Sequence, residues 1–65
     1  MTTKARIAAL QWFHDRGETP RGEGMPSFTM IGRMFNDLQL SWREHRKHPH
    51  GLYKLTDKGR QDLHE

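Results

Sequence analysis

The sequence predicts a mainly α-helical domain with a minimal β component. Two stretches, residues 4–16 and 28–38, repeat apolar side chains at spacings of three and four, which is the period of one helix face. A third stretch, Leu52–Leu55, alternates in the way expected of a short strand. The predicted order is helix, loop, helix, turn, helix, strand, helix. The side chains expected to form one core are Leu10, Phe13, Phe28, Ile31, Phe35, Leu38, Leu52 and Leu55.

Length and composition limit what such a chain can do. Sixty-five residues allow a single domain, residues 1–65, which buries only about 60% of the surface of its unfolded chain. The chain has no cysteine to form a disulfide, so we expect marginal stability that a homodimer contact or a protein partner would raise. It has no long apolar run and no signal-peptide layout, which predicts a cytoplasmic protein without a membrane span.

The first helix has clear signals at both ends. Thr3 is available as its N-cap and Gly17 as its end, which predicts a helix over residues 4–16. Residues 17–26 then contain three glycines and two prolines, a composition typical of a flexible loop. At the end of this loop, Met25 and Pro26 favour an extended backbone. We expect them to pair with the strand at Leu52–Leu55.

The central stretch predicts a helix, a tight turn and a second helix. Ser27 is expected to cap the first of these helices. Ser41 precedes Glu44 by three residues, the capping-box arrangement, which places the start of the second helix at Trp42. Pro49 ends that helix at about Lys47, because the residue before a proline avoids the helical region.

The last part of the chain should form a turn, a strand and a helix. His48–Gly51 matches the preferences of a type I turn, with proline at its second position and glycine at its fourth. The strand Leu52–Leu55 follows. Thr56 is placed to cap a short C-terminal helix, and Asp57 in its first turn suits the helix dipole.

Two short stretches resemble winged-helix DNA-binding domains. The second helix and turn of LexA-type repressors are similar to three groups of residues: Pro26-Ser27, Ile31-Gly32 and Leu38-Gln39-Leu40-Ser41. The stretch from Leu52 to Arg60, with tyrosine, then Leu-Thr, then Lys-Gly-Arg, resembles the strand-to-helix passage of MarR-like and PadR-like regulators. Only residues 42–52 separate Ser41 from Tyr53. The resemblance therefore implies a small winged helix with a shortened recognition helix and a wing reduced to the turn His48–Gly51.

The basic helix carries the predicted interface with double-stranded DNA. Arg43 and Lys47 are four residues apart and share one face, with Arg46 beside them, and such cations suit phosphate. Arg43 lies near the helix start, where helix-turn-helix proteins approach base edges. The candidate DNA-contacting residues are Gln39, Ser41, Arg43, Arg46, Lys47, His48 and Lys54. The function expected is that of a small DNA-binding transcriptional regulator or recombination accessory factor.

The sequence gives weaker support to three other functions. His45, His48 and His50 are close in sequence, but no fourth ligand matches their spacing, so neither a metal nor another cofactor is expected. No catalytic triad, carboxylate pair or phosphate-binding glycine motif is present, so we expect no enzymatic activity. The alternative to DNA binding is a protein-interaction module, in which the basic helix only aids solubility. The docking residues would then be Trp12, Trp42, Met30 and Met34.

Overall fold

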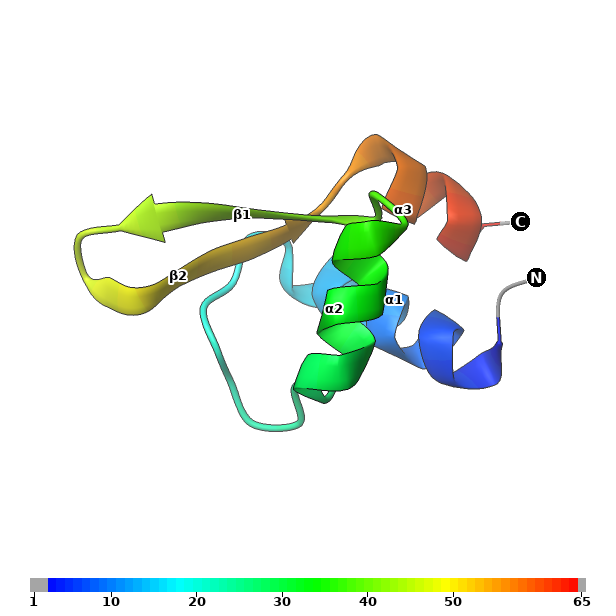
Figure 1. Ribbon diagram of the computed structural model, residues 1–65, viewed down its shortest axis with the longest axis horizontal. Helices are drawn as coiled ribbons and strands as arrows, with labels where there is room; N and C mark the ends of the chain where they lie inside the picture. The colour runs from blue at the N-terminus through cyan, green and yellow to red at the C-terminus, as the bar shows by residue number, and fades with distance from the viewer. Residues whose placement is uncertain (1–2, 65) are drawn as a thin grey trace.

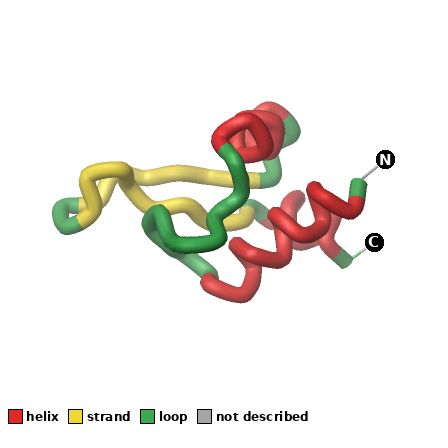
Figure 2. The backbone as a smooth tube through the Cα atoms, turned by 90° about the horizontal axis from the view of Figure 1, so that it is seen from below, coloured by secondary structure: helices red, strands yellow, loops and turns green. Residues whose placement is uncertain are grey.

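The computed structural model describes residues 3–64; the predicted domain limits at Met1 and Glu65 lie outside them. The elements are α1 (Lys4–Arg16), α2 (Phe28–Asn36), β1 (Leu40–His45), β2 (His48–Leu55) and α3 (Asp57–Leu63). The expectation of a mainly α fold with a minimal β component is confirmed. The helices gather at one end of the molecule, and the hairpin of β1 and β2 extends away from them (Figures 1 and 2). None of the helices in the described chain is long and apolar enough to span a bilayer.

Each helix starts at the residue that local chemistry predicts. The hydroxyl oxygens of Thr3, Ser27 and Thr56 accept hydrogen bonds from backbone amides three residues further on, at 3.1, 3.2 and 3.1 Å. These caps satisfy amides that have no partner within the helix. Gly17, at φ 69°, ends α1 by donating its amide to the carbonyl oxygen of Phe13. The predicted limits of the first helix are therefore confirmed.

The predicted helix over Trp42–Lys47 is wrong. Residues 40–45 form β1, and β1 pairs antiparallel with β2 through Leu40↔Leu55 and Trp42↔Tyr53. The Ser41 hydroxyl donates to the carbonyl oxygen of Lys54 across the strands, so it does not cap a helix. A six-residue helix holds few internal hydrogen bonds, whereas residues 40–45 pair with an eight-residue strand along most of their length.

The predicted turn at His48–Gly51 is also wrong, because the chain reverses earlier. The reversal is a two-residue turn at Arg46–Lys47, and β2 begins at His48. Between the pairs Arg43↔Leu52 and His45↔His48, one residue of β1 faces three of β2. This bulge holds Pro49, which has no amide to donate, and Gly51, whose φ of 76° suits glycine.

The partner of the C-terminal strand also differs from the prediction. Met25 does not pair with it. Instead, Thr19 exchanges two backbone hydrogen bonds with Tyr53, at 2.9 and 2.7 Å. On its other side Tyr53 lies opposite Trp42 of β1, so the spatial order is Thr19, β2, β1. The loop after α1 is thereby held along the base of the hairpin.

The core forms where α1, α2 and the near half of the hairpin meet. Of the predicted core residues, Leu10, Phe13, Ile31, Leu52 and Leu55 are buried, and Phe35 is partly buried against the core. The prediction that Phe28 and Leu38 are core residues is wrong, because 62% and 69% of their surface is exposed. Leu38 lies beyond the end of α2 at φ 61°, so helical spacing no longer sets its direction. The core also contains Ala9, Met34, Leu40 and Tyr53.

Gly59 provides a test of the packing of α3. A Cβ at this position would lie closer than 3.0 Å to the backbone carbonyl oxygen of Gln39. We expect Gly59→Ala to lower the free energy of unfolding by about 1–3 kcal/mol, since backbone must move to accept it. Thermal unfolding measures this change.

The matched control is Gly32→Ala. Gly32 is also helical, and a Cβ there would meet nothing within 4 Å. This substitution should stabilise the protein by about 0.5–1 kcal/mol through helix propensity alone. Equal melting temperatures for the two variants would contradict the packing of α3 on the residue that precedes β1.

Candidate nucleic-acid interface

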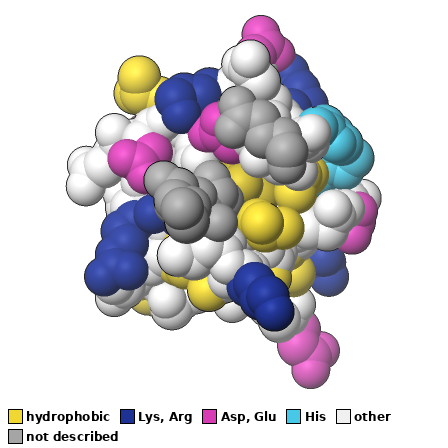
Figure 3. Space-filling model, turned by 90° about the vertical axis from the view of Figure 1, so that its right-hand side faces the viewer, with side chains coloured by type: hydrophobic (Ala, Val, Ile, Leu, Met, Phe, Trp, Pro, Cys, Tyr) yellow, Lys and Arg dark blue, Asp and Glu magenta, His cyan; other side chains and the backbone are white. Residues whose placement is uncertain are grey.

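The net positive charge of the protein resides in the hairpin. The whole chain has eleven Lys and Arg against eight Asp and Glu. Residues 40–55 hold four of those cations and one of the acids, so the remaining residues carry seven of each sign and are neutral overall. The face opposite the hairpin tip shows both signs interspersed (Figure 3). The charged residues of the hairpin are Arg43, Glu44, Arg46, Lys47 and Lys54.

Two of these cations form the tip. Arg46 and Lys47 are the two turn residues, both exposed, at the end farthest from the helices. Within residues 3–64 their side chains take part in no ion pair or side-chain hydrogen bond. The backbone amide of Lys47 donates to Nδ1 of His45 at 3.1 Å, which holds the turn in shape. The tip therefore presents two unengaged cations on a fixed backbone.

Arg43 differs because an acidic partner holds it. Its guanidinium donates two hydrogen bonds of 2.7 Å to the carboxylate of Glu18, in the loop after α1. These hydrogen bonds lower the pKa of Glu18 below its ordinary value, and Lys54 and His45 lower it further. Both partners are exposed enough that solvent screens the pair. The pair ties β1 to the helical body and occupies the fork that a phosphate would otherwise use.

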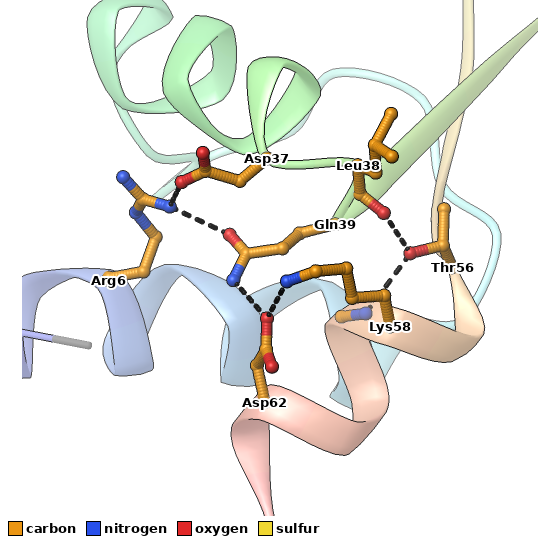
Figure 4. A network of polar contacts seen from close by, with 8 residues as sticks. Arg6, Asp37, Leu38, Gln39, Thr56, Lys58 and Asp62 are labelled. Carbon is orange, nitrogen blue, oxygen red and sulfur yellow. Dashed lines mark hydrogen bonds and ion pairs between the residues drawn. The ribbon is translucent and has the colours of Figure 1, made fainter. Parts of the chain in front are cut away.

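Gln39, a predicted DNA contact, lies inside the molecule with 3% of its surface exposed. Its side-chain oxygen accepts from Arg6 at 2.8 Å, and its nitrogen donates to Asp62 at 2.7 Å (Figure 4). Arg6 also bonds Asp37, and Lys58 also bonds Asp62. Gln39 thus joins α1 to α3 and does not reach the surface.

The other three predicted residues lie on the hairpin in different roles. Ser41 is exposed but uses its hydroxyl to bridge the strands. Lys54 lies opposite Ser41 and is exposed. His48 is half-buried, with its ring centroid 4.9 Å from that of His45. Within residues 3–64, no three His, Cys, Asp or Glu side chains gather closely enough to hold a metal ion.

The residues proposed for protein docking are mostly not free to dock. Met34 is fully buried and Met30 packs partly against the core. Trp12 lies under the loop that follows α1, with the Arg16 guanidinium 4.0 Å above its ring. Its Nε1 is buried and has no hydrogen-bond partner among the described residues. Trp42 is different, since 46% of its surface is exposed on the hairpin.

Sequence reasoning missed the hairpin and the residue that holds it. The alternation of Leu40 and Trp42 with Ser41 and Arg43 was the available signal for a strand. No comparable signal marks Glu18, because its contact with Arg43 spans 25 residues. No family model, curated protein or solved structure matches this chain.

Asp62 gives the network around Gln39 a pH dependence. Hydrogen bonds from Lys58, then from Gln39, lower the pKa of its carboxyl group below the ordinary value. The unfolded chain binds this proton at higher pH than the folded chain does. The stability that Asp62 contributes is therefore present at neutral pH and lost as the pH falls below about 4, through the lowered pKa.

We expect Asp62→Asn to lower stability at neutral pH and to flatten the loss of stability on acidification. Urea unfolding between pH 7 and pH 3 measures both effects. Glu23→Gln is the control for loss of one negative charge, since Glu23 is exposed and lies in the loop away from this network. An acid dependence of Asp62→Asn as steep as that of the parent would show that the network does not hold this carboxylate ionised.

Proposed function

We propose that this protein binds double-stranded DNA through the hairpin of β1 and β2. One observation carries the proposal: the whole net charge of the molecule lies on a hairpin that projects from a neutral helical body (Figure 1). DNA affinity depends mainly on cations that neutralise phosphates and release their counterions. Because the hairpin projects from the body and has cations at its tip, these cations can reach the duplex.

The mechanism we propose uses a β-ribbon in place of the recognition helix. The major groove of DNA admits a two-stranded ribbon as well as an α-helix. Arg46 and Lys47 at the tip and Lys54 on β2 would contact phosphates. Arg43 would join them only after releasing Glu18. In this proposal the hairpin takes the place of both the shortened recognition helix and the reduced wing that the winged-helix resemblance implies, and the role is still that of a factor in transcription or recombination.

A protein-binding role is the second candidate, supported by two exposed apolar side chains. Leu38 is 69% exposed and has a left-handed backbone, at φ 61°, that leucine rarely adopts. Phe28 is 62% exposed, with the Arg21 guanidinium 4.4 Å from its ring centre. A partner that covers Leu38 or Phe28 would leave the hairpin free. The two roles are therefore compatible on one molecule.

The salt dependence of DNA binding tests the role of the tip. Three phosphates neutralised by Arg46, Lys47 and Lys54 predict a slope of log affinity against log salt of about −3, since each contributes about −0.9. The double variant Arg46→Ala, Lys47→Ala should bind a random duplex more weakly and with a slope of about −1. Fluorescence anisotropy of a labelled duplex at several salt concentrations gives both values.

The control removes the same charge from the helical body. Lys4 and Arg33 are exposed on α1 and α2, away from the hairpin, so Lys4→Ala, Arg33→Ala should retain the parent's slope. Equal loss of affinity in both double variants would mean that net charge alone governs binding. Unchanged binding in the tip variant would exclude the hairpin as the contact surface.

Glu18 gives a test in the opposite direction. Glu18→Gln removes the carboxylate that occupies the Arg43 guanidinium. We expect tighter DNA binding and a salt slope steeper by about one unit, because a fourth cation becomes available. Glu23→Gln makes the same change in net charge in the same loop and should alter binding less. If Glu18→Gln leaves the slope unchanged, Arg43 does not contact phosphate.

A further inference from the structure

The hairpin also carries a cavity, which shares only Arg46 with the proposed phosphate contacts. The cavity has a volume of about 310 Å³ and lies beside the bulge, near the tip. That volume is at the lower end of the range of about 300–1,000 Å³ for small-molecule sites, so it suits one small group. Its lining residues are Trp42, Glu44, His45, Arg46, His48, Pro49 and Gly51.

The indole of Trp42 is held rigidly in this cavity. Its Nε1 donates a hydrogen bond of 2.7 Å to the carbonyl oxygen of His50 across the hairpin. The ring lies over Gly51, where a Cβ would approach closer than 3.0 Å to Nε1. The bulge therefore seats the indole against bare backbone, and 46% of Trp42 still faces solvent. A fixed, half-exposed indole is a good stacking surface, because little side-chain entropy is lost on binding.

The other lining groups match the chemistry of a nucleotide. The rings of His45 and His48 add flat surface, 4.9 Å apart between centroids. Arg46 lines the cavity and is next to Lys47 in the turn, so two cations are close to the cavity and available to the phosphate of a nucleotide whose base enters it. Glu44 is the one acidic group in the lining, and its carboxylate can accept from the amino group of cytosine.

From this arrangement we infer that the cavity holds one unpaired nucleobase, stacked on Trp42, of a DNA strand whose phosphates are bound by the tip. The inference rests on the proposed function and adds to it. A paired base hides its faces within the duplex stack, so this site favours a single strand or a base that has left its pair. Aromatic stacking tolerates any base, with Glu44 favouring those that offer an amino group.

The test compares two short strands with the same number of phosphates. One is oligodeoxycytidine, and the other is the same backbone with every base absent. In a Trp12→Phe protein, Trp42 is the single tryptophan and reports stacking by fluorescence quenching. We expect oligodeoxycytidine to quench Trp42 and to bind about 10-fold tighter than the abasic strand. We expect the abasic strand to bind through phosphates without quenching.

A variant of Trp42 locates the effect. Trp42→Leu keeps an apolar cover on Gly51 and removes the indole face. It should lower the affinity for oligodeoxycytidine about 10-fold and leave that for the abasic strand unchanged. The amide spectra of Leu52 and Tyr53 show whether the hairpin remains formed. If the hairpin of Trp42→Leu is not formed, Trp42→Tyr is used in its place. Trp42→Tyr should retain the preference for the strand with bases, because its ring still stacks.

The outcomes separate this inference from the proposed function. Equal affinity for the two strands, with the salt slope retained, would overturn the base site and leave phosphate binding standing. A preference for oligodeoxycytidine that survives Trp42→Leu would place the base elsewhere and overturn the inference. No binding to either strand or to duplex DNA would overturn both proposals.

Discussion

The backbone and side-chain hydrogen bonds of Gln39 hold the three helices and the base of the hairpin together. Gln39 stands between α2 and β1, where its amide donates to the carbonyl oxygen of Met34. Its own carbonyl oxygen accepts from the amide of Thr56, the first residue after β2. These two bonds close the base of the hairpin at the point where both strands leave the helices. The side chain then fixes α1 and α3 around the same point (Figure 4). In a domain this small, a buried side-chain amide whose oxygen and nitrogen are both hydrogen-bonded helps to fix one arrangement of the helices.

A hairpin held only at its base must be rigid along its length to act as a binding element. Thr19 forms a short bridge along the outer edge of β2, and the carboxylate of the adjacent Glu18 accepts hydrogen bonds from Arg43 of β1. Farther out, the indole of Trp42 bridges the strands over the bulge. This last contact uses the face of the hairpin that carries the core residues nearer the helices. The apolar face thus continues beyond the body, where no helix covers it.

The apolar contacts are concentrated near the helices, whereas the net charge is concentrated on the hairpin. The helical body carries equal numbers of cations and acids, whereas the tip adds two cations, Arg46 and Lys47, that form no ion pair with the residues that the structure describes. Glu18 restrains the cation nearest to the body. In the proposed complex with DNA, the same carboxylate would both support the hairpin and compete with phosphate for Arg43. The affinity for DNA would then depend on how firmly the loop after α1 holds Glu18 in place.

Local sequence is enough to predict the three helix starts, the end of α1 and Leu52–Leu55, the second half of β2. Caps and helical periodicity act over three or four residues, so the capping role of Thr3, Ser27 and Thr56 can be predicted from their immediate neighbours in the sequence. Residues 42–47 have no local signal that selects one structure, because the same side chains suit a capped helix or an alternating strand. Tertiary structure decided between them by supplying β2 as a partner. It also decided the roles of Gln39 and Glu18, whose partners lie more than twenty residues away along the chain. Contacts at that separation depend on the complete fold, and no local pattern encodes them.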